Sequence, residues 1–506
     1  MKNYDTEAAW HYHNGTKHPN GMLLKRHHYY EPVNRPVPYK MYKKPTAIDL
    51  HLDRSHSIPA LQAMGTNPKA DSNKIPDIDI LTRILYYSAG VTKVINYPGM
   101  GDVEFRAAAC TGALYHTEIY VVCGNIDGHG AGVYHFDPKG MKLDKLRAGD
   151  HRSVLVDAAA NHPGMEHAPV ILVYTDIFTR NSVKYQAREY RHAFWDCGTI
   201  LANTLATCSA HDLPSKVIVG FVDDTVNSLL GLNTEKEVSL VLVPIGFTQE
   251  ITNEELQITK LDLKTEPLSN YDFDDPEIQN IHQASSLVSA KEVREWRGST
   301  PKTSMDIKNI ISLKPFSENE LPQDPLEQVI VRRGSSREFS HDSISFQQLS
   351  TIIDYSTRGV QADFLEPYGT TLVQPYLIVN AVDGLKPGSY VYNREQNALQ
   401  LLKEGMFRHV AGNLGLDQNL PADSSVAVFF MTDLDTVLKR FGNRGYRAAQ
   451  LEASIIGGRF YLAAYAQKLG ASGLTFYDDA VTQFFSPHAK DKSVMFMVTL
   501  GKKKYF

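Results

Sequence analysis

The 506-residue sequence has few of the features that mark secreted, membrane-spanning or nucleic-acid-binding proteins. Its four cysteines lie far apart and form no CxxC pair, so the sequence predicts reduced, mostly buried thiols rather than a disulfide framework. No apolar run reaches the roughly 18 residues needed to span a bilayer. A net charge of -5 excludes a global basic field for nucleic acid. The first residues lack the apolar core of a signal peptide, and we therefore expect a cytoplasmic protein.

What the sequence does contain is an internal repeat. Residues 119–136 (IYVVCGNIDGHGAGVYHF) resemble 375–392 (PYLIVNAVDGLKPGSYVY), with matched residues 256 positions apart. The same offset links REYR at 188–191 to RGYR at 444–447. Chance matches drift in register, whereas this offset persists for about a hundred residues, so the sequence predicts two copies of one fold.

Each copy is expected to contain a helix, a strand, a hairpin, a second strand, a long helix and a final strand. Apolar residues at helical spacing predict the long helices from Arg188 to about Ala210 and from Arg444 to Leu469. A stretch rich in acidic residues and proline separates the copies. The expected divisions are 1–75 as an N-terminal arm or cap, 76–261 as the first copy, 262–325 as a connector and 326–506 as the second copy.

One short segment of the second copy, VIVRRGSSREFS at 329–340, concentrates anion-binding side chains. Its apolar run indicates a strand, and arginine forks with serine hydroxyls suit phosphate oxygens. Taken alone, a solvated turn is the commoner explanation for such a segment. GASG at 470–473 and GKKK at 501–504 add loop amides and cations in the same copy, without equivalents in the first. The predicted phosphate contacts are Arg332, Arg333, Ser335, Ser336, Arg337, Gly470, Ser472, Gly473, Lys502 and Lys503.

The first copy carries different chemistry. Its segment FRAAACTGALYH at 105–116 joins an arginine to a loop of small residues that lets the backbone approach a flat ligand. Lys184 stands beside Tyr185, where the second copy has Arg440 and Phe441. A neighbouring lysine can lower the pKa of a phenol and let tyrosine act as an acid or base. The alternative, an exposed lysine beside a packing tyrosine, stays open.

Taken in order, these motifs resemble those of the FMN-dependent nitroreductase superfamily, in particular its SagB-type dehydrogenase branch, which includes azoline oxidases. That branch carries an RRSxR-like segment, matched at 332–337, and an R-x-x-P-S-A-G-A-L-Y-P loop, matched at 106–116. It also has a K-Y-x-x-R-x-Y-R segment, matched at 184–191, and a Y-H-x-x-T-K-H start, matched at 12–18. Two departures stand in the loop, where Ala109-Cys110 replaces Pro-Ser and His116 replaces the second proline.

The resemblance implies an α+β fold of two tandem nitroreductase-like domains, each a central sheet flanked by helices, which form an intramolecular pseudo-dimer. Nitroreductase dimers bind flavin between their subunits, and a duplicated chain would offer two such sites. The complementary losses in the two copies leave one site complete, so we expect one FMN per chain. The second copy would hold the phosphate. The first copy would serve the ring and substrate through Arg106, Thr111, Gly112, Ala113, Leu114, Lys184 and Tyr185.

The function implied by the resemblance is oxidation of peptide-borne thiazolines or oxazolines to azoles, with dioxygen reoxidising the flavin. Lys184 and Tyr185 would be the catalytic residues, Tyr185 removing the ring proton with help from Lys184. One alternative is an NAD(P)H-dependent reductase of nitroaromatics or quinones, which needs no base. Another is a degenerate scaffold within a biosynthetic complex. We expect a peptide or small-molecule heterocycle as substrate, biosynthetic proteins or a second copy as partners, and no metal, nucleic acid or membrane.

Overall fold

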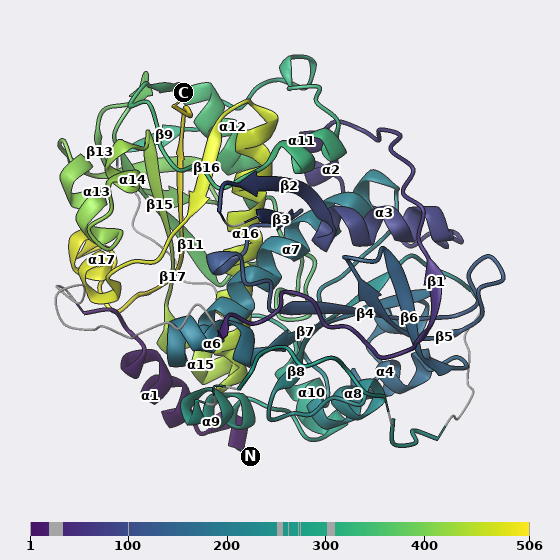
Figure 1. The fold of residues 1–506 in the computed structure, drawn as a ribbon. Coiled ribbons are helices and arrows are strands. Elements are labelled where there is room, and N and C mark those ends of the chain that lie inside the picture. The colour runs from purple at the N-terminus through teal and green to yellow at the C-terminus, as the bar shows by residue number, and fades with distance from the viewer. Residues whose placement is uncertain are drawn as a thin grey trace.

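Two β-sheets lie on opposite sides of a central pair of long helices (Figure 1). The computed structural model describes residues 2–19, 34–99, 101–249, 257–261, 263–271, 273, 275–300 and 309–504. The first sheet has the order β1 (Thr46–Asp49), β6 (Lys142–Ala148), β5 (Gly132–Asp137), β4 (Thr117–Cys123), β7 (Val170–Ile177), β8 (Glu237–Ile245). The second has the order β16 (Gly470–Gly473), β17 (Ser493–Gly501), β15 (Val426–Thr432), β11 (Val373–Val379), β13 (Gly388–Asn393), β14 (Ala398–Glu404), β9 (Ile310–Ser312).

Helices cover both sheets and fill the space between them (Figure 1). Those of the first half and the segment after it are α1 (Glu7–Gly15), α2 (Ala60–Gly65), α3 (Ile78–Ala89), α4 (Arg152–Ala158), α5 (Pro163–Glu166), α6 (Phe178–Tyr185), α7 (Glu189–Ala210), α8 (Asp223–Leu230), α9 (Pro276–Ala284) and α10 (Ala290–Trp296). Those of the second half are α11 (Leu326–Arg332), α12 (Phe346–Thr357), α13 (Arg408–Leu414), α14 (Asn419–Asp423), α15 (Leu434–Phe441), α16 (Arg444–Ala466) and α17 (Asp478–Phe485).

The two halves repeat the same plan, as the sequence predicted. Strands β4, β5, β6 and β8 begin and end 256 positions before β11, β13, β14 and β17, and α6 stands in the same relation to α15. The long helices α7 and α16 lie within a few residues of their predicted bounds. The expected α+β fold of two tandem domains, joined as an intramolecular pseudo-dimer, is therefore confirmed.

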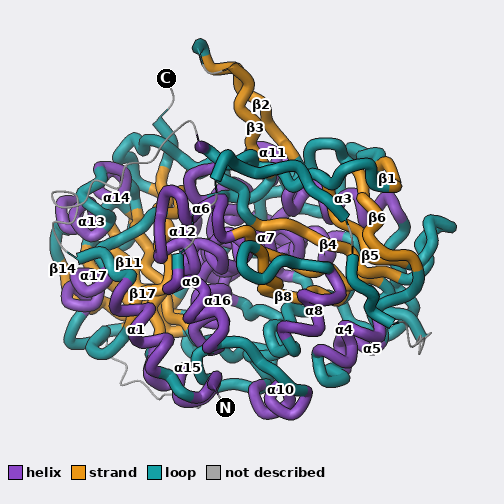
Figure 2. Tube along the Cα trace, turned by 60° about the horizontal axis from the view of Figure 1, so that its bottom comes forward, coloured by secondary structure: helices purple, strands orange, loops and turns teal. Residues whose placement is uncertain are grey.

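The repeat is interrupted at one point near the predicted ligand loop. Between α3 and β4 lie 27 residues, against 15 between α12 and β11. The longer interval contains a hairpin of β2 (Val91–Tyr97) and β3 (Gly101–Arg106), which pair antiparallel. Figure 2 shows this hairpin projecting from the body of the molecule. The first copy thus carries an arm that the second copy lacks.

The two copies meet along α7 and α16, which are buried over almost their whole length. Small side chains permit the close crossing. A Cβ added at Gly198 would collide with Ser454, its counterpart in the second copy, and a Cβ added at Gly458 would lie 2.6 Å from the Cβ of its counterpart Ala202. Because both helices are buried all round, neither has the single apolar stripe of a surface helix.

Reciprocal ion pairs clamp each copy to the other. Arg188 and Arg191 at the start of α7 bind Asp478 at the start of α17, over 3.1 and 2.6 Å. At the equivalent place, Arg447 of α16 binds Asp223 of α8 over 2.9 Å. Burial alone would raise the pKa of Asp478, but the two guanidinium groups hold it well below its usual range. The arginines of the two repeated RxYR segments therefore join the two copies.

Some local expectations need correction. The apolar run before Arg332, which indicated a strand, is the helix α11. The predicted arm and connector both contribute edge strands, because β1 pairs with β6 and β9 pairs with β14. Parts of both segments lie outside the described residues, and the three boundaries between the four divisions remain predictions.

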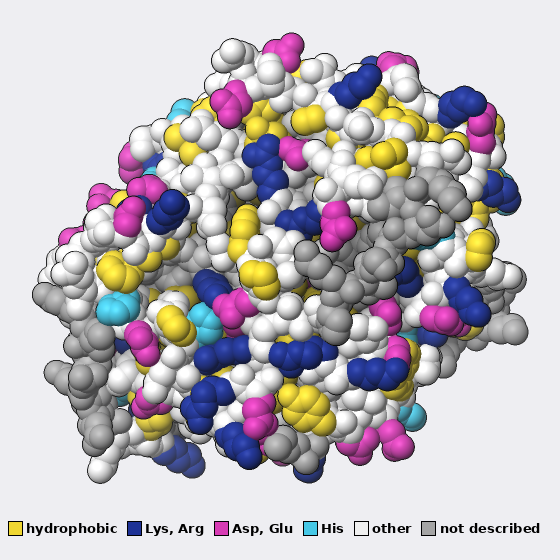
Figure 3. All heavy atoms as spheres, turned by 180° about the vertical axis from the view of Figure 1, so that it is seen from behind, with side chains coloured by type: hydrophobic (Ala, Val, Ile, Leu, Met, Phe, Trp, Pro, Cys, Tyr) yellow, Lys and Arg dark blue, Asp and Glu magenta, His cyan; other side chains and the backbone are white. Residues whose placement is uncertain are grey.

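The mixed surface charge and the free cysteines are what the composition of the chain predicts. On the face in Figure 3, basic and acidic side chains of described residues are interspersed rather than gathered by sign. All four cysteines are free thiols; three are buried and Cys110 is half-buried. Among the described residues, every helix is too short or too polar to cross a membrane.

Candidate active site

The segments predicted to bind phosphate come together at one edge of the second sheet. After α11 the chain runs beside β16, where Ser335 forms a parallel bridge with Ala471. The Ser336 amide donates to the Ala471 carbonyl over 2.9 Å. Further along, Phe339 pairs with Lys503 just beyond β17. The sequence linked the arginine–serine, GASG and lysine segments only because all three occur in one copy. In the structure they are neighbours.

We call the place where these three segments meet the junction. Two serine hydroxyls lie in it. The Ser336 hydroxyl is buried and has no hydrogen-bond partner among the described residues, and a Cβ on Gly470 would collide with it. The Ser335 hydroxyl lies 3.3 Å from that of Tyr461, which also accepts a hydrogen bond from the Gly473 amide. A buried hydroxyl without a partner, next to glycine backbone, is a donor that an anion can satisfy.

Arg333 links this junction to the first copy. Its guanidinium donates to the carbonyl oxygens of Arg106 and Ala107 over 3.1 and 2.9 Å. It also lies 5.9 Å from the centre of the Tyr461 ring, and burial lowers its pKa. Nearby, the Lys503 ammonium lies 4.2 Å from the centre of the Tyr465 ring, also on α16. Two cations thus stand beside the serine hydroxyls, one of them touching the predicted ring-binding loop.

The remaining predicted phosphate residues are placed differently. Arg332 forms an ion pair with Asp324 over 2.6 Å. Arg337 and Lys502 are exposed, and Ser472 is buried within β16. The junction is therefore formed mainly by Arg333, the two serines, the glycines of β16 and Lys503.

The loop after β3 has a constrained backbone. Thr111, Gly112 and Ala113 form a short 3-10 helix, followed by the buried Leu114. Gly112 has φ of 63°, a left-handed conformation that glycine adopts without strain. Asp196 of α7 fixes the loop by accepting from the Thr111 amide and hydroxyl, each over 2.8 Å. Arg106, at the base of the loop, lies over the Tyr115 ring at 4.9 Å.

Lys184 and Tyr185 end α6 beside this loop. A Cβ on Gly112 would lie 2.8 Å from the Tyr185 hydroxyl oxygen and 3.5 Å from the Lys184 ammonium. The ammonium lies 5.1 Å from the centre of the Tyr185 ring. Lys184 is an exposed residue, but partial burial of its ammonium group, and then the charge of Arg35, lower its pKa. The predicted acid–base pair and the predicted ring-binding loop are therefore in contact.

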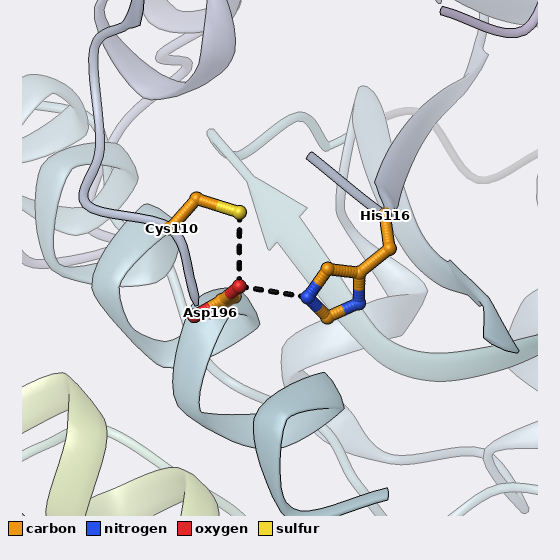
Figure 4. A group of neighbouring side chains, drawn as sticks. All are labelled: Cys110, His116 and Asp196. Carbon is orange, nitrogen blue, oxygen red and sulfur yellow. Dashed lines mark hydrogen bonds and ion pairs between the residues drawn. The ribbon is translucent and has the colours of Figure 1, made fainter. Parts of the chain in front are cut away.

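Behind the loop lies a buried polar cluster that the sequence did not predict (Figure 4). The Cys110 thiol donates to Asp196 over 2.9 Å, and His116 Nε2 lies 2.7 Å from the same carboxylate. The other nitrogen, Nδ1, lies 2.5 Å from Asp176. Burial alone would lower the pKa of His116, but the two carboxylates raise it well above its usual range. Burial, followed by the charge of Asp196, raises the pKa of the Cys110 thiol to about 11.

This cluster explains the two departures from the family pattern. Cys110 and His116 replace the usual serine and proline, and both bind one carboxylate, Asp196. The second copy has Glu366 and Leu372 at the equivalent positions, so it cannot form the cluster. The departures were the available signal, but their common partner lies on a distant helix. Hydrogen bonds already join these groups, and the expectation of no metal remains a prediction.

The pseudo-symmetric counterpart of this junction is filled by the chain itself. Val217, the equivalent of Gly473, forms a parallel bridge with Ala362. The next residue, Asp363, is buried and accepts a hydrogen bond from the Gly220 amide over 2.7 Å. The loop of the second copy thus binds the first copy directly at the place where a second ligand site would lie.

Comparisons with known proteins agree with this architecture. The model of the nitroreductase family matches residues 90–247 and 330–502. A crystal structure of a candidate nitroreductase from Anabaena variabilis covers 98% of this chain and 99% of its own, with a TM-score of 0.77 and 25% identity. The trifolitoxin-processing protein TfxB of Rhizobium leguminosarum bv. trifolii is 30% identical over 161 residues, 31% of this chain and 43% of TfxB. The microcin B17-processing protein McbC of Escherichia coli is 27% identical over 156 residues, 29% of this chain and 56% of McbC.

Proposed function

Because the chain belongs to the nitroreductase family, we propose that it is a flavoprotein oxidoreductase that binds one FMN between its two copies and oxidises azoline rings of a peptide to azoles. The observation that carries this proposal is the reach of Arg333 to the carbonyl groups of Arg106 and Ala107. That contact joins the phosphate-type donors of the second copy to the loop that bears Lys184 and Tyr185.

The residues at the junction fit a flavin mononucleotide. Ser336 offers a buried hydroxyl that no described residue binds, and the absence of a side chain at Gly470 leaves room for it. Arg333 and Lys503 supply cations for a phosphate. Gly112 lets the loop backbone approach a flat ring closely. The counterpart site, closed by Asp363 and its neighbours, supports a single flavin per chain.

Lys184 and Tyr185 would carry the proton chemistry. Aromatisation of an azoline removes a proton from the ring carbon next to the carbonyl group and a hydride from the neighbouring ring carbon. The Tyr185 oxygen would accept the proton as it passes its own to the Lys184 amine, whose pKa partial burial lowers, so that the neutral amine is more readily available as the acceptor. When bound, FMN supplies the two-electron acceptor for the hydride, and dioxygen can reoxidise it.

The peptide substrate is proposed from the two relatives, which by name process trifolitoxin and microcin B17. Their matched regions span less than two thirds of each relative, so the heterocycle and any biosynthetic partner proteins remain part of the proposal. We also propose a cytoplasmic location, a further homodimer, and no role for nucleic acid or membranes. A small-molecule heterocycle would satisfy the same chemistry.

The first test is an absorbance spectrum of the purified protein with quantification of released flavin. We expect about one FMN per chain, because within the described part of the chain one junction presents the complete donor set. A ratio near two would overturn the single-site assignment. A colourless protein that takes up no added FMN would favour the non-catalytic scaffold instead.

The second test separates the proton chemistry from flavin binding. Lys184→Ala and Tyr185→Phe should both abolish azoline oxidation while the protein stays yellow. The matched control is Lys439→Ala, which removes an exposed lysine from the equivalent helix α15 and should leave turnover unchanged. Full activity in both site variants would refute the assigned roles.

A second function is favoured by the exposure of Lys184 and the partial exposure of Tyr185, which leave this side of the junction open to small acceptors. A reductase of nitroaromatics or quinones would use NAD(P)H and would need no base. Rapid bleaching of the flavin by NADH in the absence of peptide, unaffected by Tyr185→Phe, would establish this alternative.

A further inference from the structure

The second copy contains a cavity of about 430 Å³ that lies behind its own loop, away from the junction described above. It is bounded by the end of α12, the loop before β11, the end of β13 and the facing side of α16. Its size is that of a pocket for a small organic molecule. Neither the flavin nor the proton chemistry proposed above makes use of it.

The same place exists in the first copy but is almost completely filled. A hollow of only about 10 Å³ remains there, lined by Ser88, Asp196 and Ile200 among others. Their counterparts Ser356, Glu452 and Ile456 line the large cavity. The two spaces are therefore one feature of the fold, retained twice and occupied differently.

Large side chains fill the space in the first copy. The Arg106 guanidinium lies between two aromatic rings, 4.9 Å from the centre of Tyr115 and 5.0 Å from that of Tyr39. Beside them, Arg180 and Glu118 form a fully buried ion pair. Arginine, tyrosine and glutamate side chains thus occupy the volume between sheet and helix.

The second copy has smaller residues at these positions. Ala362 stands for Arg106, Thr371 for Tyr115 and Thr436 for Arg180, each 256 positions later. Protein interiors close over missing volume only in part, and an open cavity costs stability. An open cavity of about 430 Å³ is therefore expected to hold a ligand.

Two cations flank the cavity floor. Arg394 follows β13 and Lys492 precedes β17, on either side of the ends of β11 and β15. Burial lowers the pKa of Lys492, and Asp433 opposes this only in part. The Asp433 carboxylate already accepts from the amide and hydroxyl of Thr436, over 3.0 and 2.8 Å. Lys492 is half-buried, and an ammonium whose burial is offset only in part favours an anionic ligand.

Other polar groups in the wall are equally incomplete. The hydroxyls of Ser356 and Thr370 are buried and have no hydrogen-bond partner among the described residues. The Glu452 carboxyl, by contrast, is occupied by the Thr371 hydroxyl and the Leu372 amide, over 2.6 and 2.7 Å. The rest of the wall is largely apolar and includes Val360, Val373, Met431 and Ile456.

We propose that this cavity is a binding site for a small organic carboxylate with an apolar body, held through its charge by Lys492 and Arg394. The apolar wall takes the body of the ligand, and the two free hydroxyls complete the hydrogen bonds of the carboxylate. Inorganic anions fit less well, because they leave the apolar wall uncovered. The site is independent of the flavin and of the azoline reaction.

The test is calorimetric titration of the full-length, flavin-loaded protein with phenylacetate. We expect saturable binding of one molecule per chain, and at least tenfold weaker binding of the uncharged phenylacetamide and of inorganic phosphate. Lys492→Met should weaken phenylacetate binding at least tenfold. Lys490→Met, which removes an exposed lysine two residues away, is the control and should change nothing.

The cavity itself is tested by restoring the residues of the first copy. Thr371→Tyr and, separately, Thr436→Arg should abolish phenylacetate binding without changing the flavin spectrum, because each refills the space. The unchanged spectrum reports that the variants are folded. Absence of binding to the parent protein, equal binding of phenylacetamide, or undiminished binding in both filled variants would overturn the proposal.

Discussion

The two copies share one backbone plan and differ in what fills it. In the first copy a cysteine, a histidine and an arginine–tyrosine stack brace the loop before β4, and Lys184 with Tyr185 lies against that loop. In the second copy the equivalent loop closes on its neighbour and leaves a cavity behind it, while the anion-binding segments gather at the sheet edge. Two identical subunits cannot divide labour in this way, because every change would appear in both sites. Duplication within one chain removes that constraint.

The buried arginine–aspartate ion pairs at Asp478 and Asp223 are a feature that the two copies share. Substitutions there should have the largest effect. Asp478→Asn and Asp223→Asn should each lower the free energy of unfolding by about 3–5 kcal/mol, because each leaves two buried guanidinium groups without their carboxylate. Urea denaturation measures the loss. Asp435→Asn, in an exposed pair with Lys439, is the control and should have no measurable effect. A large loss in only one of the two buried variants would show that the clamps are not equivalent.

The repeat itself could be predicted from the sequence because strand and helix patterns survive at a constant offset. Tyr120 and Tyr376, or Tyr134 and Tyr390, keep their spacing because they lie in strands whose lengths the sheets hold fixed. The short apolar run before Arg332 was assigned wrongly, since three apolar residues suit a buried helix turn as well as a strand.

The candidate site was predictable only in part, for a related reason. Motif residues such as Arg333 and Tyr185 could be identified by their chemistry and by their absence from the other copy. The carbonyl of Ala107 that binds Arg333, and the carboxylate of Asp196 that binds His116, could not be predicted, because the packing of distant elements selects them. The cavity of the second copy depends on several small residues at once and leaves no local pattern.

The two equivalent acids of the long helices offer the next comparison. Asp196 of the first copy is bound by His116, whereas Glu452 of the second copy accepts hydrogen bonds from the Thr371 hydroxyl and the Leu372 amide. Burial, which those hydrogen bonds offset only in part, raises the pKa of Glu452 to about 7. The unfolded chain releases this proton near pH 4.3. The folded chain therefore binds the extra proton between these values, and stability falls as the pH rises through that window.

Glu452→Gln should remove this dependence. For the parent protein we expect the Glu452 contribution to lower the free energy of unfolding by up to about 3 kcal/mol between pH 4.5 and 8. The variant should lack that contribution, as measured by urea denaturation across the same range. Glu395→Gln changes an exposed acid at the mouth of the same cavity and should keep the parent slope. Identical slopes in the parent and Glu452→Gln would contradict the assignment.

The division of phosphate binding between the copies predicts a smaller effect. Arg333→Met should weaken FMN binding roughly 10- to 100-fold, the range expected for losing a charge-assisted contact. The matched variant is Lys216→Met, which removes a cation from the first-copy segment equivalent to β16, where it pairs with Glu366. Flavin retained after gel filtration and a fluorescence titration measure both. Equal losses in the two variants would mean that both copies bind flavin phosphate.

The smallest effect concerns the contact between the loop and the acid–base pair. Gly112→Ala should lower the free energy of unfolding, measured by urea denaturation, by about 1 kcal/mol because of its left-handed backbone. It should lower it further because the added Cβ meets the Tyr185 hydroxyl at 2.8 Å. Gly128→Ala has a similar φ of 80° with no neighbour within 4 Å, so it isolates the backbone cost. In a Tyr185→Phe background the extra cost of Gly112→Ala should disappear, because the colliding oxygen is gone. If Gly112→Ala and Gly128→Ala cost the same in the parent protein, the loop does not contact Tyr185 in solution, and the acid–base pair loses its link to the ring-binding loop.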